Sequence, residues 1–69
     1  MSIVIERYRT ADNIIATIEM KKDSKLYHVT VYGIHGNIPV LEYRRDFTSI
    51  QNARKTIKRR YPGISKAEV

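Results

Sequence analysis

The segment from residue 47 to residue 63, FTSIQNARKTIKRRYPG, constrains the fold most strongly, because both ends of a helix can be recognised in it. Thr48 is the predicted N-cap, and Gln51 follows three residues later, where a capping box carries Glu or Gln. Pro62 and Gly63 end the pattern. Between these signals, apolar residues recur at the spacing of one helix face: Ile50, Ala53, Ile57 and Tyr61.

The same predicted helix is strongly cationic. It contains five basic residues and no acidic one: Arg54, Lys55, Lys58, Arg59 and Arg60. Residues 1–41 hold five Lys/Arg against four Asp/Glu, whereas residues 42–69 hold eight against three, so +5 of the net charge of +6 lies in the second part. A basic region of this kind predicts contact with nucleic acid or another polyanion. The alternative is a solvated helix face that contributes only solubility.

Three segments before the helix predict β-strands, because apolar residues alternate with polar ones in them. They are residues 14–21 (IIATIEMK), 26–33 (LYHVTVYG) and 38–45 (IPVLEYRR), separated by the turn-like stretches KDSK and IHGN. A helix capped by Asp12 or Asn13 is the alternative for the first of them. Residues 2–8 form either a further strand or an N-terminal arm that orders against a partner.

These elements predict a single α+β domain over residues 1–69. Three antiparallel strands, or four if residues 2–8 pair, form a meander with the C-terminal helix packed on one face. Residues 64–69 are predicted to be a frayed tail. The predicted inner face of the sheet contributes these residues to the core: Ala16, Ile18, Met20, Tyr27, Val29, Val31, Leu41, Tyr43 and Phe47.

The other face of this sheet is left uncovered in the predicted fold. Glu19, Glu42 and Arg44 are predicted to point outward there. The residues predicted to form an exposed, partly apolar patch are Ile15, Thr17, Thr30, Tyr32 and Val40. Because exposed apolar patches mark contact surfaces, a homodimer or a protein-interaction module is the alternative function.

Catalytic chemistry finds no support in the residue spacing. His28 and His35 have no Cys or second His at metal-ligand spacing and are predicted to be surface histidines. No glycine-rich phosphate loop occurs. We therefore expect no catalytic residues, no metal, no cofactor and no enzymatic activity. No apolar run is long enough to span a bilayer, so we expect no membrane association and a cytoplasmic protein.

The basic residues are the candidate nucleic-acid contacts. Lys55 and Arg59 lie one helical turn apart, opposite Ile57. Arg54 and Lys58 are predicted on one flank of the apolar stripe. The remaining contacts are Arg60 on the other flank and Arg44 and Arg45 just before the helix. Lys and Arg clusters of this kind neutralise phosphates, and the release of counterions from the nucleic acid favours binding. Such contacts do not read the base sequence.

Two stretches, KLYHVTVYGIHGN and RRDFTSIQNARKTIKRRY, resemble the three-stranded sheet and helix of arm-type DNA-binding domains in phage and transposon integrases. The resemblance implies a small DNA-binding protein of phage or mobile-element type, whose open sheet face enters the major groove. Tyr27 stands where the family usually has Trp, and the carboxylates predicted on the open face oppose DNA binding there. The matching positions are Lys25, Tyr27, Val29, Gly36, Arg44, Arg45, Phe47, Thr48 and Ala53.

Overall fold

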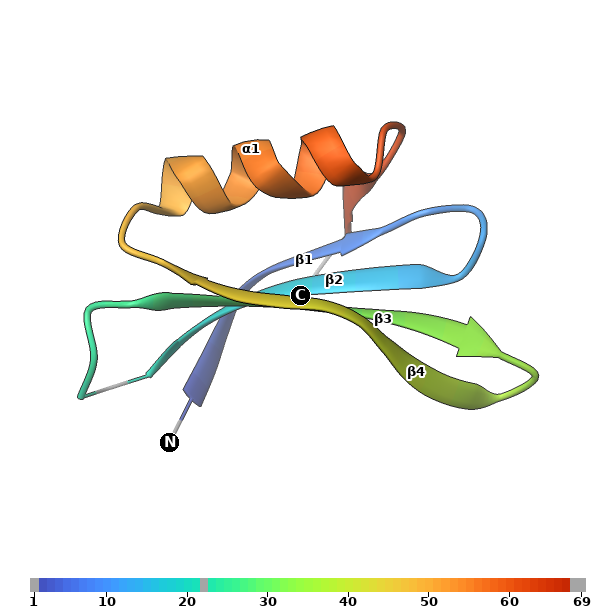
Figure 1. Cartoon of the computed structure of the whole chain (residues 1–69), viewed down its shortest axis with the longest axis horizontal. Helices are drawn as coiled ribbons and strands as arrows, with labels where there is room; N and C mark the ends of the chain where they lie inside the picture. The colour runs from blue at the N-terminus through green and yellow to red at the C-terminus, as the bar shows by residue number, and fades with distance from the viewer. Residues whose placement is uncertain (1, 22, 68–69) are drawn as a thin grey trace.

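The computed structural model describes residues 2–21 and 23–67. Within these residues, five antiparallel strands form one sheet in the order β4-β3-β2-β1-β5, and a single helix, α1, lies across one face (Figure 1). The predicted α+β class, with its antiparallel meander and one covering helix, is confirmed. The elements are β1 (Ser2–Arg9), β2 (Ile14–Lys21), β3 (Tyr27–His35), β4 (Ile38–Phe47), α1 (Ile50–Arg60) and β5 (Ser65–Ala67).

The first and last segments of the described chain are both strands. β1 pairs with β2 on one side and with β5 on the other, so residues 2–8 are not a free arm. The prediction of a frayed tail is wrong for residues 65–67, and Glu68 and Val69 lie outside the described residues. Gly63, at φ 89°, turns the chain after α1, and the buried Ile64 anchors it against the core.

The start of α1 differs from the prediction by one residue. Ser49, and not Thr48, is the N-cap: its backbone is extended, at φ −126° and ψ 128°, and its Oγ accepts a hydrogen bond from the Asn52 N–H at 3.4 Å. At the other end, the Tyr61 N–H donates to the Ile57 carbonyl at 3.0 Å. The predicted apolar stripe is confirmed, because Ala53 and Ile57 are buried.

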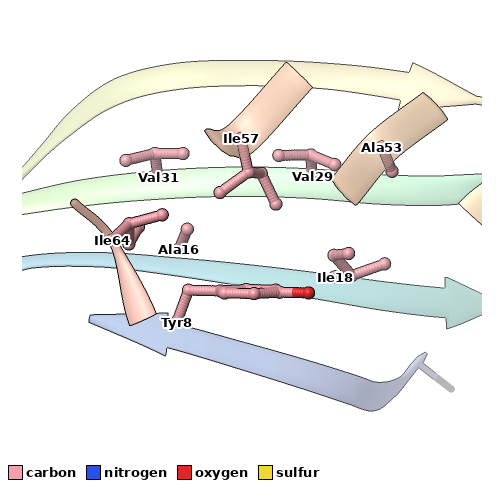
Figure 2. Close-up of a cluster of buried hydrophobic side chains, with 8 residues drawn as sticks. All are labelled: Tyr8, Ala16, Ile18, Val29, Val31, Ala53, Ile57 and Ile64. Carbon is pink, nitrogen blue, oxygen red and sulfur yellow. The ribbon is translucent and has the colours of Figure 1, made fainter. Parts of the chain in front are cut away.

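The core lies between α1 and the central strands (Figure 2). Alternate residues of β2 and β3 point at the helix and are fully buried: Ala16, Ile18, Val29 and Val31. Tyr8 and Ile64 close the core on the β1 side, and Tyr43 and Phe47 pack against it from β4. Burial of such apolar side chains, at about 25 cal/mol per Å², is the main force that holds the helix on the sheet.

A β-bulge reverses the predicted faces of the part of β4 that precedes Tyr43. Val31 pairs with Tyr43, but the next residue of β3, Tyr32, pairs with Leu41, so Glu42 is an extra residue. An offset of one residue moves every following side chain to the opposite face. Leu41 therefore lies on the open face and is 53% exposed, and its predicted place in the core is wrong.

The bulge also moves the two β4 residues that were predicted to point outward beside it. Val40 pairs with Gly33, which places it on the helix side of the sheet, and it leaves the predicted open-face patch. The Glu42 carboxylate lies over Gly33, where a Cβ would be 2.6 Å from its Oε1, and 3.5 Å from Nε2 of His35. The open face therefore lacks one of the two carboxylates predicted for it.

Candidate nucleic-acid interface

A groove of about 460 Å³ lies between the end of β4 and α1. Three of its lining residues are cations that the sequence predicted as phosphate contacts: Arg45, Lys55 and Arg59. We call it the β4 groove, and its other lining residues are Asp46, Phe47, Thr48, Asn52 and Thr56. Hydroxyl and amide groups beside cations are the side chains that hydrogen-bond phosphate oxygens.

Asp46, the one carboxylate among the described residues that line the β4 groove, is engaged elsewhere. Asp46 pairs with His28 across the strands, on the open side of the sheet, and its Oδ1 lies 2.5 Å from Nδ1 of His28. Arg45, one residue earlier, projects on the helix side opposite Val29. Because successive side chains of a strand point to opposite faces, the Asp46 carboxylate points away from the groove and Arg45 points toward it.

Aromatic rings of β4 hold two arginines, Arg45 in this groove and Arg60 next to Arg59 on α1. The guanidinium carbon of Arg45 lies 5.3 Å from the centre of the Phe47 ring, and that of Arg60 lies 4.1 Å from the centre of the Tyr43 ring. Both distances suit cation–π contacts, which favour a defined position of the charged group. The guanidinium edges stay available because both arginines are exposed.

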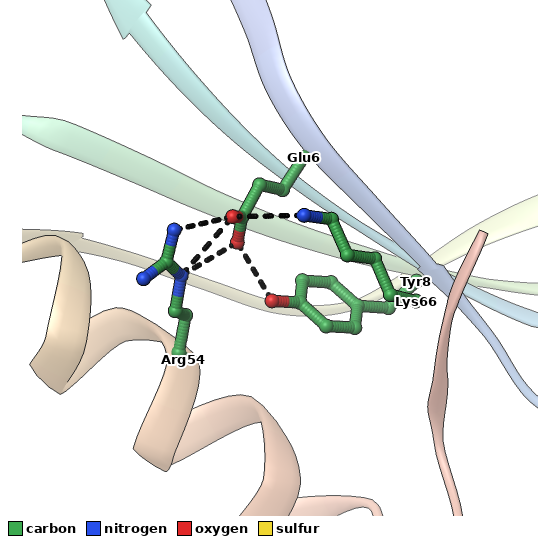
Figure 3. A network of polar contacts seen from close by, with 4 residues as sticks. All are labelled: Glu6, Tyr8, Arg54 and Lys66. Atoms are coloured by element: carbon green, nitrogen blue, oxygen red, sulfur yellow. Dashed lines mark hydrogen bonds and ion pairs between the residues drawn. The ribbon is translucent and has the colours of Figure 1, made fainter. Parts of the chain in front are cut away.

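On the other flank of α1, Arg54 is bound to a buried carboxylate (Figure 3). Its Nε donates to Glu6 Oε1 at 2.9 Å and its Nη2 to Oε2 at 2.5 Å. The Tyr8 hydroxyl donates to Oε1 at 2.7 Å, and Nζ of Lys66 lies 3.4 Å from Oε2. Glu6 is 4% exposed, so it needs these donors in place of water. The network joins β1, α1 and β5.

This network shifts the titration of its members. The hydrogen bonds from Arg54 outweigh the effect of burial and, with help from Tyr8, lower the pKa of Glu6 to about 2. Burial, followed by the hydrogen bond to Glu6, raises the pKa of Tyr8 to about 12. The hydrogen bond to Glu6 also raises the pKa of Arg54. All three groups therefore keep one protonation state across the neutral pH range.

A second hollow, of about 590 Å³, opens beside this network, and we call it the β5 hollow. Its lining residues are Glu6, Tyr8, Arg54, Lys58, Ile64, Ser65 and Lys66. Because Glu6 is held by Arg54, the ammonium groups of Lys58 and Lys66 dominate its rim. Lys66 belongs to β5 and was not among the predicted contacts, since its segment was predicted to be frayed.

The seven predicted contacts therefore lie in different places. Arg45, Lys55 and Arg59 surround the β4 groove with Arg60 beside it, whereas Lys58 and Arg54 lie on the β5 side. Arg44 pairs with Thr30 and lies on the open face.

Arg7 and Arg9 also lie on the open face and were missed by the sequence analysis. Arg7 begins a cross-strand row that continues through Thr17 and Thr30 to Arg44. The alternation in ERYR, with Glu6 and Tyr8 on the buried side, is the sequence feature that could have placed both arginines there.

Exposed apolar side chains gather on the β3–β4 hairpin, which extends past the end of α1 in Figure 1. Leu41 and Tyr32 (40% exposed) lie on the open face, and Ile38 (64%) and Val40 (44%) lie on the helix side. Ile15, Thr17 and Thr30 adjoin Tyr32 on the open face. This cluster is centred on the hairpin, one strand further out than predicted.

Of the two histidines, only His35 matches the predicted surface position, with 66% of its side chain exposed, whereas that of His28 is 13% exposed. Among residues 2–21 and 23–67, no three His, Asp or Glu side chains are grouped closely enough to hold a metal ion. No helix within the same residues has the length and apolarity needed to cross a membrane.

The chain was compared with family models, with curated proteins and with solved structures, and none of the three comparisons gave a match. The resemblance to integrase arm-type domains therefore remains a prediction from the sequence.

Proposed function

We propose that the protein binds nucleic acid, with DNA as the preferred form, through phosphate contacts made by α1 and the end of β4. The observation that carries the proposal is the β4 groove, where Arg45, Lys55 and Arg59 surround one concave surface and the neighbouring carboxylate is turned to the other face. Arg60 and Lys58 extend this basic surface along α1, whereas Arg44 lies on the open face and is not among these contacts. The phage or mobile-element type of protein implied by the resemblance is consistent with such a small basic domain.

Arg54 is omitted from the proposed contacts, although it belongs to the same basic run. Its guanidinium holds the buried Glu6 through two nitrogens, and a phosphate would have to compete with that carboxylate. Charge-assisted, bidentate pairs of this kind are the strongest hydrogen bonds in proteins. We assign Arg54 a structural role and Lys55 and Arg59 the binding role.

The test is a fluorescence anisotropy titration of labelled duplex DNA at two salt concentrations. Each lost phosphate contact should reduce the magnitude of the negative slope of log K against log salt by about 0.9, so Lys55→Gln with Arg59→Gln should reduce it by about 2. The matched control is Arg9→Gln with Lys21→Gln, which removes the same charge from exposed positions of β1 and β2. Equal losses in both variants would indicate a general charge effect and contradict a site at the groove.

A second candidate function, a homodimerising or protein-interaction module, is favoured by the exposed apolar cluster on the β3–β4 hairpin. Tyr32→Lys with Leu41→Lys would place charges on its open side and should abolish self-association. Sedimentation velocity over a range of concentrations measures this directly. A parent protein that is monomeric throughout removes the homodimer. Apolar association should also vary little with salt, in contrast to phosphate binding.

A further inference from the structure

The outward crest of α1 is formed by polar side chains that can hydrogen-bond to DNA bases. Gln51 and Lys55 follow one another at the i, i+4 spacing on the crest, Lys58 and Arg59 lie on either side of Lys55, and all four are exposed. Asn52 is exposed beside them. Gln and Asn pair with the edge of adenine, and Arg and Lys with that of guanine, in the major groove.

Both flanks of this crest are hollowed and basic. On one side, the β4 groove carries Arg45 and Arg59. On the other side, the β5 hollow carries Lys58 and Lys66, and Glu6, the one carboxylate among its described lining residues, is held by Arg54. α1 therefore projects as a ridge between two rows of cations.

The cations of the second flank are available to a ligand. Lys66 is 62% exposed at its side chain, and its Nζ makes one long contact of 3.4 Å to Glu6. Lys58 is exposed on α1 itself. Arg54 supplies three hydrogen bonds to Glu6 and the Tyr8 hydroxyl a fourth, so the Lys66 contact is the longest in the network and its ammonium group is the one most free to turn to a ligand.

From this arrangement we propose that α1 enters the major groove of B-form duplex DNA, with one row of cations on the phosphates of each strand. The inference rests on the proposed function and adds the form of the nucleic acid and the element that reads it. A helix with side chains is about 10–12 Å in diameter. The major groove of B-DNA is about 12 Å wide and admits a helix. The major groove of an RNA duplex is deep and narrow and does not.

A single strand has one row of phosphates and can engage one flank of α1 at a time. Anisotropy titrations should therefore give at least tenfold weaker binding for single-stranded DNA and for duplex RNA than for duplex DNA of the same sequence. Equal affinity for single-stranded and duplex DNA overturns the inference and leaves the proposed function intact. An absence of salt-dependent binding to any nucleic acid removes both.

Two variants with the same loss of charge test the two flanks separately. Arg45→Gln with Arg59→Gln removes cations of the β4 groove, and Lys58→Gln with Lys66→Gln removes those of the β5 hollow. Both should reduce the magnitude of the salt slope for duplex DNA by about 2, since each removes two phosphate contacts. If the lysine pair changes nothing while the arginine pair weakens binding, one flank alone contacts DNA and the inference fails.

Modified duplexes identify the groove directly. A bulky group on thymine C5 projects into the major groove, whereas one on guanine N2 projects into the minor groove. The first should weaken binding at least tenfold and the second should leave it within twofold. The opposite pattern would place the protein in the minor groove and overturn the inference. Circular dichroism of each protein variant confirms that the fold is retained.

Discussion

The two flanks of α1 carry similar basic residues and use them differently. Toward β1, Arg54 binds the buried carboxylate of Glu6. Toward β4, Lys55 and Arg59 are exposed, and within residues 2–21 and 23–67 neither forms an ion pair. Arg54 and Lys55 are adjacent in sequence, so local composition does not separate their roles. Their roles differ because Arg54 faces Glu6 across the packing layer, whereas Lys55 lies on the outer side of the helix.

The energetic reason for the difference is the environment of the partner. A carboxylate removed from water is costly unless it is paired and hydrogen-bonded, so Glu6 makes Arg54 part of the folded structure. An exposed cation with no partner contributes little to stability and keeps its hydration until a polyanion arrives. The β1 flank thus fixes the helix, and the β4 flank remains available for a ligand.

The largest expected effect is loss of the apolar contact that supports both flanks. Ile57 is 1% exposed and packs between α1 and the sheet. Ile57→Ala should lower the free energy of unfolding by about 2–5 kcal/mol, the usual range for a large-to-small change in a core. Urea denaturation measures it, with Ile38→Ala on the exposed hairpin as the control. A loss below about half a kcal/mol would mean that the helix is not anchored by this residue.

Removal of Glu6 should break the β1 flank alone. Glu6→Ala leaves the Arg54 guanidinium and the Tyr8 hydroxyl without their acceptor. We expect a loss of about 2–4 kcal/mol, slightly below the roughly 3–5 kcal/mol typical of a broken buried pair, because Arg54 is partly exposed and can be hydrated. Glu19→Ala, on the open face of β2, is the control. If the two variants are equally stable, the network does not hold the helix.

The pair of Glu6 and Arg54 also shows where sequence patterns stop being informative. The helix and the meander strands could be predicted because their periods are local properties of the chain. Glu6 and Arg54 are 48 positions apart, and their contact depends on strand order, which no local pattern contains. The alternation of apolar and polar residues also gives no sign of the bulge at Glu42. The predicted positions of Leu41 and Val40 were therefore wrong.

β5 was missed because it has three residues, too few for a period to be recognised. With it, Lys66 and the β5 hollow were missed as well. The basic residues of the β4 groove were among the residues predicted from the sequence. Lys55 and Arg59 follow from helical spacing, and Arg45 from its position just before the helix. What the sequence could not show was that Asp46 turns away to His28.

Acid should remove the stabilising effect of Glu6 on the β1 flank. The pKa of Glu6 is lowered from 4.5 to about 2 in the folded protein, so its stabilising effect is complete above pH 4.5 and is lost as pH falls toward 2. Urea denaturation of the parent protein and of Glu6→Ala at several pH values should therefore show a difference that shrinks below pH 4.5. A difference that is constant from pH 7 to pH 2.5 would contradict the lowered pKa.

The smallest expected effect on stability belongs to the β4 flank, in contrast to the β1 flank, where Arg54 holds Glu6. Lys55→Gln with Arg59→Gln removes two charges from exposed positions that form no ion pair among the described residues. Because such surface changes are usually within about half a kcal/mol, we expect an unchanged or slightly higher free energy of unfolding, as repulsion among neighbouring cations is relieved. The measurement is urea denaturation at low salt, where repulsion is least screened.

The same variant should show the loss of DNA affinity proposed above. A stability loss above about 1 kcal/mol would show that these cations, like Arg54, hold the fold together, and any loss of binding could then come from unfolding.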